Sequence, residues 1–157
     1  MIPLVLILLF IRYSYAIMMV VSYAFSSALV QFTKHVLCPD FDRPYRYFGI
    51  HHLPQLHLVG GVDVNSFNSM PSGHTATAFG ACCLLALLAK NKRLGLIFFL
   101  AAFLVGFSRV YLSQHFLEDV VVGSAFGIIC SLFAYYLFEV RHIINMPKGA
   151  FGQKLKG

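Results

Sequence analysis

Five runs of apolar residues, separated by short polar or charged stretches, dominate the sequence. The runs cover residues 1–11, 13–33, 73–89, 94–107 and 120–138. A transmembrane helix needs about 20 predominantly apolar residues, and most of these runs approach that length. A helix can cross a bilayer because it satisfies its backbone hydrogen bonds within its own segment. We therefore predict an all-α fold: one membrane-embedded domain over residues 1–157, a polytopic bundle of about five transmembrane segments.

The composition favours a membrane protein over a soluble one. Hydrophobic residues make up 59% of the chain and charged residues 11%, whereas a soluble domain usually has about 25% charged residues. The net charge of +6 comes from short basic clusters between apolar runs, as in juxtamembrane anchors. We therefore expect a membrane as the partner and no nucleic acid, and we leave the oligomeric state open.

The first run, residues 1–11, is short for a spanning helix. It lacks the basic residues that precede the apolar part of a secretory signal peptide, and it ends at Arg12. We interpret it as a short first helix, or as the end of a longer helix that begins before this sequence.

Basic residues predict the orientation, because cytoplasmic loops carry an excess of Lys and Arg. The basic turn at residues 90–93 and the basic tail at residues 139–157 are separated by two helices, so they share a side, which we assign to the cytoplasm. Residues 34–70 and 108–119 then face the outside. Three cations on that outer side break the rule and are therefore candidates for a function: Lys34, Arg43 and Arg46.

Residues 108–119 hold an arginine, a histidine and two acids between two apolar runs. His115 and Asp119 are four residues apart, so on a helix they share one face. The carboxylate can then fix the imidazole tautomer and leave the other ring nitrogen as a nucleophile or base. Arg109 can bind a phosphate or carboxylate through its fork of donors. The alternative is a short interfacial loop in which the His–Asp pair only stabilises a helix.

A second motif, Pro71-Ser72-Gly73-His74, stands where the outer loop ends and the third apolar run begins. Ser72 suits a helix N-cap, and Gly73 lets a ligand approach the backbone closely. The free amides at a helix N-terminus bind anions. Alone, the motif also fits an ordinary capped helix start with an incidental histidine.

Combined, these residues suit phosphoryl transfer at the outer face. Cations and backbone amides bind phosphate, and of two histidines one can attack while the other protonates the leaving oxygen. A carboxylate cluster of the kind that holds magnesium does not accompany them, so we expect neither a metal nor a cofactor. The loop histidines His51, His52 and His57 lack a clear fourth zinc ligand and are interpreted as interfacial polar residues.

The motifs resemble those of the type-2 phosphatidic acid phosphatase superfamily. Ser108-Arg109, five residues, His115, three residues and Asp119 match its third signature, and residues 71–74 match its second. The first signature is usually Lys, six residues, Arg-Pro, whereas here eight residues separate Lys34 from Arg43. Either the loop absorbs two extra residues, or Lys34 is not a phosphate ligand.

The resemblance implies a role for each matched residue. His115 would form a phosphohistidine, Asp119 would orient it, and His74 would protonate the leaving group. The residues implied to hold the phosphoryl oxygens are Lys34, Arg43, Ser72, Gly73 and Arg109. Members of this family look like six-helix membrane proteins with the site at the outer face. The run 13–33 would correspond to the third helix, so one helix and part of another would be missing at the N-terminus.

The implied function is an integral membrane phosphatase, metal-independent, that hydrolyses a lipid phosphate or diphosphate. Its site would face the periplasm or exterior of a bacterial inner membrane. The candidate substrates are phosphatidic acid, phosphatidylglycerol phosphate, undecaprenyl diphosphate and lipid A. A lipid phosphotransferase with the same site and a non-catalytic relative are the alternatives.

Overall fold

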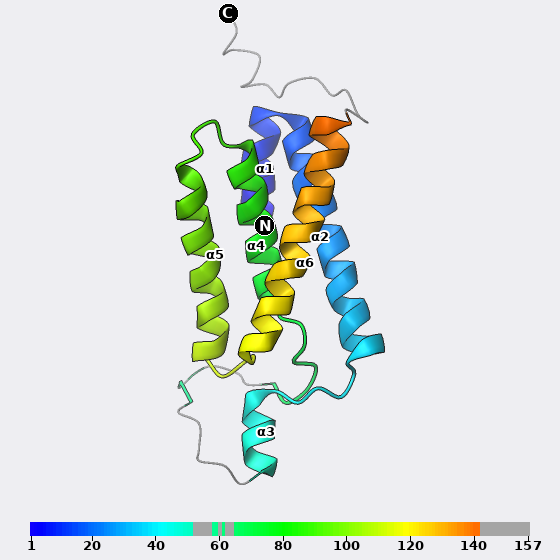
Figure 1. Ribbon diagram of the computed structural model, residues 1–157, viewed down its shortest axis with the longest axis vertical. Helices are drawn as coiled ribbons and strands as arrows, with labels where there is room; N and C mark the ends of the chain where they lie inside the picture. Colours follow the sequence, from blue (N-terminus) through cyan, green and yellow to red (C-terminus); the bar gives the residue numbers. More distant parts are fainter. Residues whose placement is uncertain (52–57, 60, 62–64, 142–157) are drawn as a thin grey trace, which may run out of the picture.

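The computed structural model describes residues 1–51, 58–59, 61 and 65–141, and every regular element in them is a helix (Figure 1). The elements are α1 (Ile2–Ile11), α2 (Tyr13–Phe32), η1 (Thr33–Leu37), α3 (Pro44–Ile50), α4 (Gly73–Leu88), α5 (Leu94–Tyr111), α6 (Leu117–Tyr135) and η2 (Tyr136–Val140). The elements η1 and η2 are π-helical turns that continue α2 and α6. The predicted all-α bundle with five apolar segments is confirmed.

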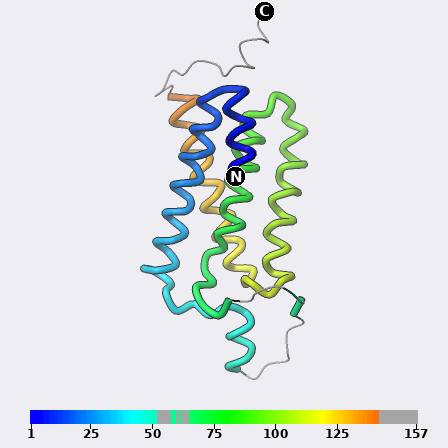
Figure 2. Tube along the Cα trace, turned by 180° about the vertical axis from the view of Figure 1, so that it is seen from behind, coloured from blue at the N-terminus to red at the C-terminus, as the bar shows by residue number. Residues whose placement is uncertain are grey.

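Four long helices, α2, α4, α5 and α6, run along the long axis of the molecule (Figure 1). Three helical segments are long and apolar enough to cross a membrane: Tyr13–Leu37, Leu94–Tyr111 and Leu117–Val140. The remaining apolar helices, α1 and α4, are shorter. Seen from behind, α1 lies beside the upper half of the bundle and the N-terminus lies near mid-height (Figure 2).

Several helix boundaries differ from the apolar runs: η1 continues the second run to Leu37, and α5 continues the fourth run to Tyr111. Helix α6 begins at Leu117 and includes Glu118 and Asp119, three residues before the apolar run. Acidic residues stabilise the first turn of a helix through its dipole. This helix therefore begins at its acidic residues, before the apolar run. At the other end, residues 139 and 140, which we had assigned to the tail, belong to η2. The rest of the predicted tail, residues 142–157, lies outside the described residues.

Small residues bring α4 and α6 into close contact. A Cβ atom added at Gly127 would lie 2.2 Å from the Ala76 carbonyl oxygen, and one added at Gly123 would lie 2.5 Å from the Ser72 carbonyl oxygen. Glycines four residues apart allow membrane helices to pack backbone against backbone. This packing fixes the start of α6 against the start of α4, where the site residues gather.

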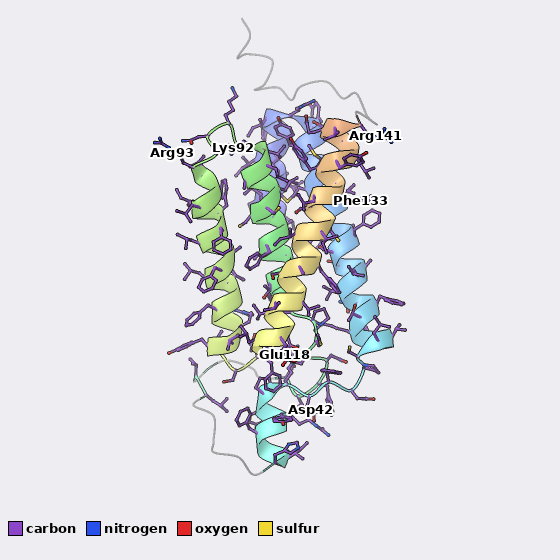
Figure 3. The ribbon with its side chains drawn as sticks, in the orientation of Figure 1. Asp42, Lys92, Arg93, Glu118, Phe133 and Arg141 are labelled. Atoms are coloured by element: carbon purple, nitrogen blue, oxygen red, sulfur yellow. The ribbon has the colours of Figure 1, made fainter. Side chains whose placement is uncertain are left out.

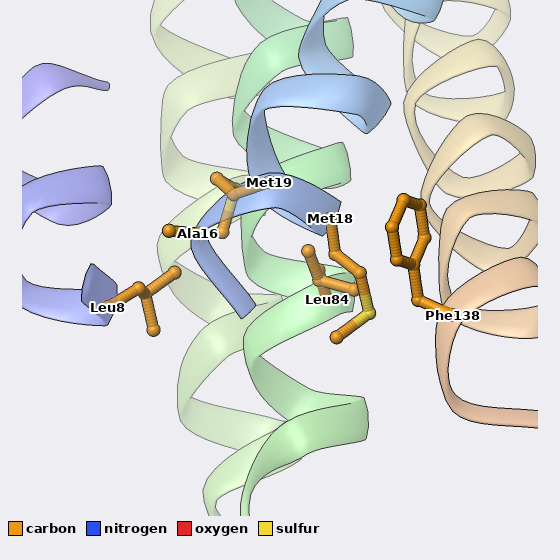
Figure 4. Packing of buried hydrophobic residues seen from close by; sticks show 6 residues of the cluster. All are labelled: Leu8, Ala16, Met18, Met19, Leu84 and Phe138. Atoms are coloured by element: carbon orange, nitrogen blue, oxygen red, sulfur yellow. The ribbon is translucent and has the colours of Figure 1, made fainter. Parts of the chain in front are cut away.

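The two ends of the bundle carry different kinds of side chain. One end holds a cluster of buried apolar side chains (Figure 4): Leu8, Ala16, Met18, Met19, Leu84 and Phe138. Beside it, Arg12 and Glu139 form an ion pair of 2.7 Å. Lys92, Arg93 and Arg141 lie at this end, whereas Asp42 and Glu118 lie at the opposite end (Figure 3). The basic turn therefore shares an end with Arg141, as the alternation of helices predicts.

Candidate active site

A cavity of about 1340 Å³ opens at the end of the bundle that carries α3. Six of the eight site residues predicted from the sequence line it: Lys34, Arg43, Gly73, His74, Arg109 and His115. The other two, Ser72 and Asp119, are buried and belong to the wall behind it. Residues from four separate parts of the chain thus meet at one place, as the orientation argument requires.

The His115–Asp119 pair forms, but not along one face of a helix. His115 lies in the loop before α6, Phe116 is the N-cap residue, and Asp119 is the third residue of the helix. The Asp119 carboxylate accepts the Phe116 backbone N–H at 2.9 Å and lies 3.3 Å from His115 Nδ1. The pair is therefore held by the capping geometry of α6, and both side chains are 3% exposed.

The environment of His115 suits a nucleophile. Burial lowers the pKa of His115, the hydrogen bond to Asp119 opposes that effect, and the charge of Arg43 adds to the lowering. Because a carboxylate accepts, Nδ1 carries the proton and Nε2 keeps its lone pair. His115 also lines the cavity, so a neutral imidazole with one unprotonated nitrogen faces the space for a substrate.

Lys34 reaches the cavity in spite of its unusual spacing to Arg43. It belongs to the π-helical turn Thr33–Leu37, and its Nζ donates to the Asn68 carbonyl oxygen at 2.7 Å. A π-turn holds more residues per turn than an α-helix and is frequent at functional sites. The π-turn and the loop after it absorb the two extra residues, which favours the first of the two alternatives. A phosphate-binding role for Lys34 stays a prediction.

The two arginines of the site converge on Gln114, which we did not single out from the sequence. Arg43 Nη1 donates to the Gln114 backbone oxygen at 3.3 Å, and Arg109 Nη1 donates to the Gln114 side-chain oxygen at 3.0 Å. Arg109 Nε also contacts the Ser108 hydroxyl at 3.2 Å. The position of Gln114 directly before His115 was the one feature of the sequence that could have identified it. Each guanidinium carries five N–H donors, so donors are left for a phosphate.

At the start of α4, only some of the predicted site residues line the cavity. Ser72 is the N-cap, as expected, and its Oγ accepts the Thr75 hydroxyl at 2.9 Å and the Thr75 backbone N–H at 3.5 Å. Ser72 is fully buried and does not line the cavity. Gly73 and His74 do line it, and His74 is exposed. Of the amides at the start of α4, which lack intrahelical acceptors, those of Ser72 and Thr75 bond to the Asp119 carbonyl oxygen and to Ser72 Oγ. An anion-binding role for the amides of Gly73 and His74 stays a prediction.

Ser69 is a second residue that we did not single out. Its side chain is fully buried, and its hydroxyl donates to Asp119 Oδ2. The sequence offers a serine two residues before Pro71 among several other loop serines, so its partner was not predictable.

Candidate metal ligands are assessed among the described residues. His51 Nδ1 lies 2.9 Å from the Tyr47 carbonyl oxygen, whereas His52 and His57 lie outside the described residues. Within those residues, no three or more His, Cys, Asp or Glu side chains are placed to hold a metal ion. Metal independence therefore stays a prediction.

A family model described as the PAP2 superfamily matches residues 13–143. The chain belongs to the PAP2 superfamily. The match covers α2 to η2 and includes all eight predicted site residues, so the predicted membership is confirmed.

Similar curated proteins include a lipid A 1-phosphatase and a bacitracin transport permease protein. A 90-residue stretch is 36% identical to a lipid A 1-phosphatase of Porphyromonas gingivalis, covering 55% of this chain and 20% of that protein. A 69-residue stretch is 35% identical to the bacitracin transport permease protein BcrC of Bacillus licheniformis, covering 44% of this chain and 33% of that protein. This PAP2 chain thus spans a third or less of these relatives.

The fold is also similar to a solved one. The crystal structure of Aquifex aeolicus LpxE superimposes with a TM-score of 0.72 at 29% sequence identity. The match covers 85% of this PAP2 chain and 74% of the LpxE chain. Together with the three helical segments that are long and apolar enough to cross a membrane, this supports a membrane protein with a helical fold.

Proposed function

We propose that this PAP2 chain is an integral membrane phosphatase that hydrolyses a lipid phosphate or diphosphate monoester through a phosphohistidine. The observation that carries the proposal is His115: one ring nitrogen is held by Asp119, and the ring lines a cavity shared with three cations and His74. A fixed, unprotonated nitrogen beside a cationic pocket is the arrangement of a nucleophile directed at a phosphorus atom.

In the first step Nε2 of His115 attacks phosphorus, and the bond from phosphorus to the leaving oxygen breaks. Lys34, Arg43, Arg109 and the first-turn amides of α4 stabilise the charge on the phosphoryl oxygens. His74, protonated at this stage, gives its proton to the leaving oxygen.

In the second step a water molecule attacks phosphorus, and the phosphorus–nitrogen bond breaks. Neutral His74 takes a proton from that water, so inorganic phosphate leaves and both histidines return to their starting states. Asp119 stabilises the positive imidazole that exists between the two steps. The steps balance without any redox partner or metal ion.

The cavity supports a lipid substrate. It continues from the cationic end along α2 and α4 past Tyr23, Val30, Ala78 and Ala81 to the N-terminal residues. Its volume exceeds the roughly 300–1,000 Å³ of ordinary small-molecule pockets. Its lining changes from charged to apolar along its length, which matches a phosphate headgroup joined to hydrocarbon chains.

The named relatives make lipid A 1-phosphate the first substrate to test. The location that we propose is a bacterial inner membrane with the site on the periplasmic side. Lys92 and Arg93 of the basic turn lie at the end opposite Asp42 and Glu118 (Figure 3), and basic loops favour the cytoplasm. Thiol labelling from outside, in a variant without native cysteines, should reach Asp42→Cys and spare Lys92→Cys; the reverse pattern would overturn the orientation.

The test of function is phosphate release from a panel of phosphatidic acid, phosphatidylglycerol phosphate, undecaprenyl diphosphate and lipid A, with His115→Ala as the control. Each lipid is assayed with and without a second lipid as phosphoryl acceptor. Release without acceptor supports a hydrolase, whereas product only with acceptor supports the phosphotransferase alternative. A wild-type chain inert on the whole panel in both formats would refute the proposal.

A further inference from the structure

The loop segment Ser66–Ser69 contacts two of the three proposed phosphate-binding cations, Arg43 and Lys34, through its backbone. The Ser66 and Phe67 carbonyl oxygens accept Arg43 N and Nε, each at 2.9 Å, and the Asn68 carbonyl oxygen accepts Lys34 Nζ at 2.7 Å. Asn68 has φ of 56°, the left-handed region that non-glycine residues seldom adopt. Such backbone is retained where the surroundings demand it, often at a functional site. Here the residue with this conformation is Asn68, whose carbonyl oxygen accepts the hydrogen bond from Lys34.

The same segment reaches the nucleophile through its last side chain. The Ser69 hydroxyl donates to Asp119 Oδ2, the oxygen that also accepts Phe116 N at 2.9 Å and faces His115 Nδ1 at 3.3 Å. Two of these donors belong to the turn that contains Asp119. Ser69 comes from 50 residues away in the sequence, and its own backbone N–H is held by the Phe41 carbonyl oxygen at 3.1 Å.

A third donor on one carboxylate oxygen does more than satisfy a buried charge. The Phe116 amide and His115 belong to the same short segment as Asp119, so these two partners restrain rotation of the carboxylate only relative to the start of α6. A donor from the opposite loop restricts that rotation, and an orienting carboxylate in turn decides which imidazole nitrogen carries the proton. Outer partners of this kind commonly fix the tautomer of a functional histidine.

We propose that Ser69 is a positioning residue for the His115 nucleophile, acting through Asp119 and tying that carboxylate to the loop that holds Lys34 and Arg43. The segment Ser66–Ser69 thereby fixes the position of the attacking nitrogen relative to the anion pocket. This inference rests on the proposed phosphatase function for its kinetic consequence, whereas the imidazole tautomer of His115 is independent of turnover.

The decisive variant is Ser69→Ala, which removes the hydroxyl and leaves a smaller side chain. The matched control is Ser131→Ala, because Ser131 is also fully buried and donates within its own helix, to Ile128 at 2.9 Å, away from the site. Histidine ¹⁵N spectra of the full chain in detergent give the tautomer, with the His115 signal assigned by its loss in His115→Gln. Phosphate release gives kcat and KM in the same preparations.

We expect the wild type and Ser131→Ala to show His115 as a single tautomer with the proton on Nδ1. In Ser69→Ala a second tautomer should appear, and kcat should fall about 10- to 100-fold, the usual effect of losing an outer partner, with KM within about twofold. A single unchanged tautomer in Ser69→Ala would overturn the proposal, as would a kcat equal to that of Ser131→Ala. A wild type that releases no phosphate would instead refute the proposed function, and the tautomer result would still decide the role of Ser69.

Discussion

Substitution of Gly123 by alanine tests whether helix packing sets the geometry of the site. The added Cβ would lie 2.5 Å from the Ser72 carbonyl oxygen and 3.3 Å from the Ser72 backbone nitrogen, whereas ordinary contact begins at 3.4 Å. Both neighbours are backbone atoms, so the helices themselves must move, by roughly 1 Å in a close-packed interior. That movement also stretches the hydrogen bond of 2.9 Å from Ser72 N to the Asp119 carbonyl oxygen.

The substitution should have a small effect on stability and a large effect on activity. Overpacking costs about 1–3 kcal/mol of the free energy of unfolding, and the better helix propensity of alanine returns about 1 kcal/mol. A misplacement of about 1 Å between reacting groups can cost on the order of 10²-fold in rate. Gly123→Ala should therefore fold with at most about 2 kcal/mol lost, yet turn over a lipid phosphate about 10²-fold more slowly.

The matched control is Gly95→Ala on α5, whose added Cβ would lie 3.9 Å from the Ala86 side chain, an ordinary contact. Both variants are compared with the wild type for kcat/KM of phosphate release and for Tm in one detergent. Turnover of Gly123→Ala within about twofold of Gly95→Ala would show that the α4–α6 contact does not set the catalytic geometry.

Three further predictions follow from the site. His74→Ala should slow turnover of a lipid alcohol ester by about 10²–10⁴-fold, the range for general acid catalysis, and should slow turnover of p-nitrophenyl phosphate clearly less, because that leaving group needs little protonation and only water attack then depends on His74; equal losses would contradict the assigned acid. Burial lowers the pKa of His115, and only the neutral imidazole attacks, so the acid limb of kcat/KM should lie below the ordinary value of about 6.5; an acid limb centred above that value would show that burial does not control this group. The basic limb should belong to His74, which must be protonated to act as the acid and whose pKa is also lowered by burial and by the charge of Arg109. Activity should survive EDTA, and vanadate should inhibit; loss in EDTA that magnesium restores would exclude a metal-free site.

Much of the fold was predictable because apolar runs and basic turns report directly on the bilayer. The helices follow the runs, and the turn at residues 90–93 lies at the same end as Arg141, as predicted. The helix ends were less predictable, since α6 starts on two acids that a hydrophobicity argument excludes. Capping and the helix dipole decide such boundaries over one or two turns.

The candidate site was predictable where its spacing is local and was missed where it depends on a distant loop. The four-residue separation of His115 and Asp119 predicted their contact, although a cap rather than a helical face produces it. Gln114 offers no signal beyond its position next to His115, and Ser69 offers none, because Arg43 and Asp119, their respective partners, come from distant segments. The π-turn that brings Lys34 to the cavity was likewise hidden, since spacing alone does not reveal helix type.

The most direct test of the central claim is trapping of the phosphoenzyme by rapid quenching in alkaline detergent after mixing with a ³²P-labelled lipid phosphate. The wild type should yield an acid-labile, base-stable phosphohistidine that maps to His115, and His74→Ala should form it slowly from this lipid substrate, because the leaving oxygen is no longer protonated. Asp119→Asn should form it more slowly, since the imidazole is kept without its charged partner. A phosphoenzyme trapped in His115→Ala, or label on a different residue of the wild type, would contradict the assignment of His115 as the nucleophile.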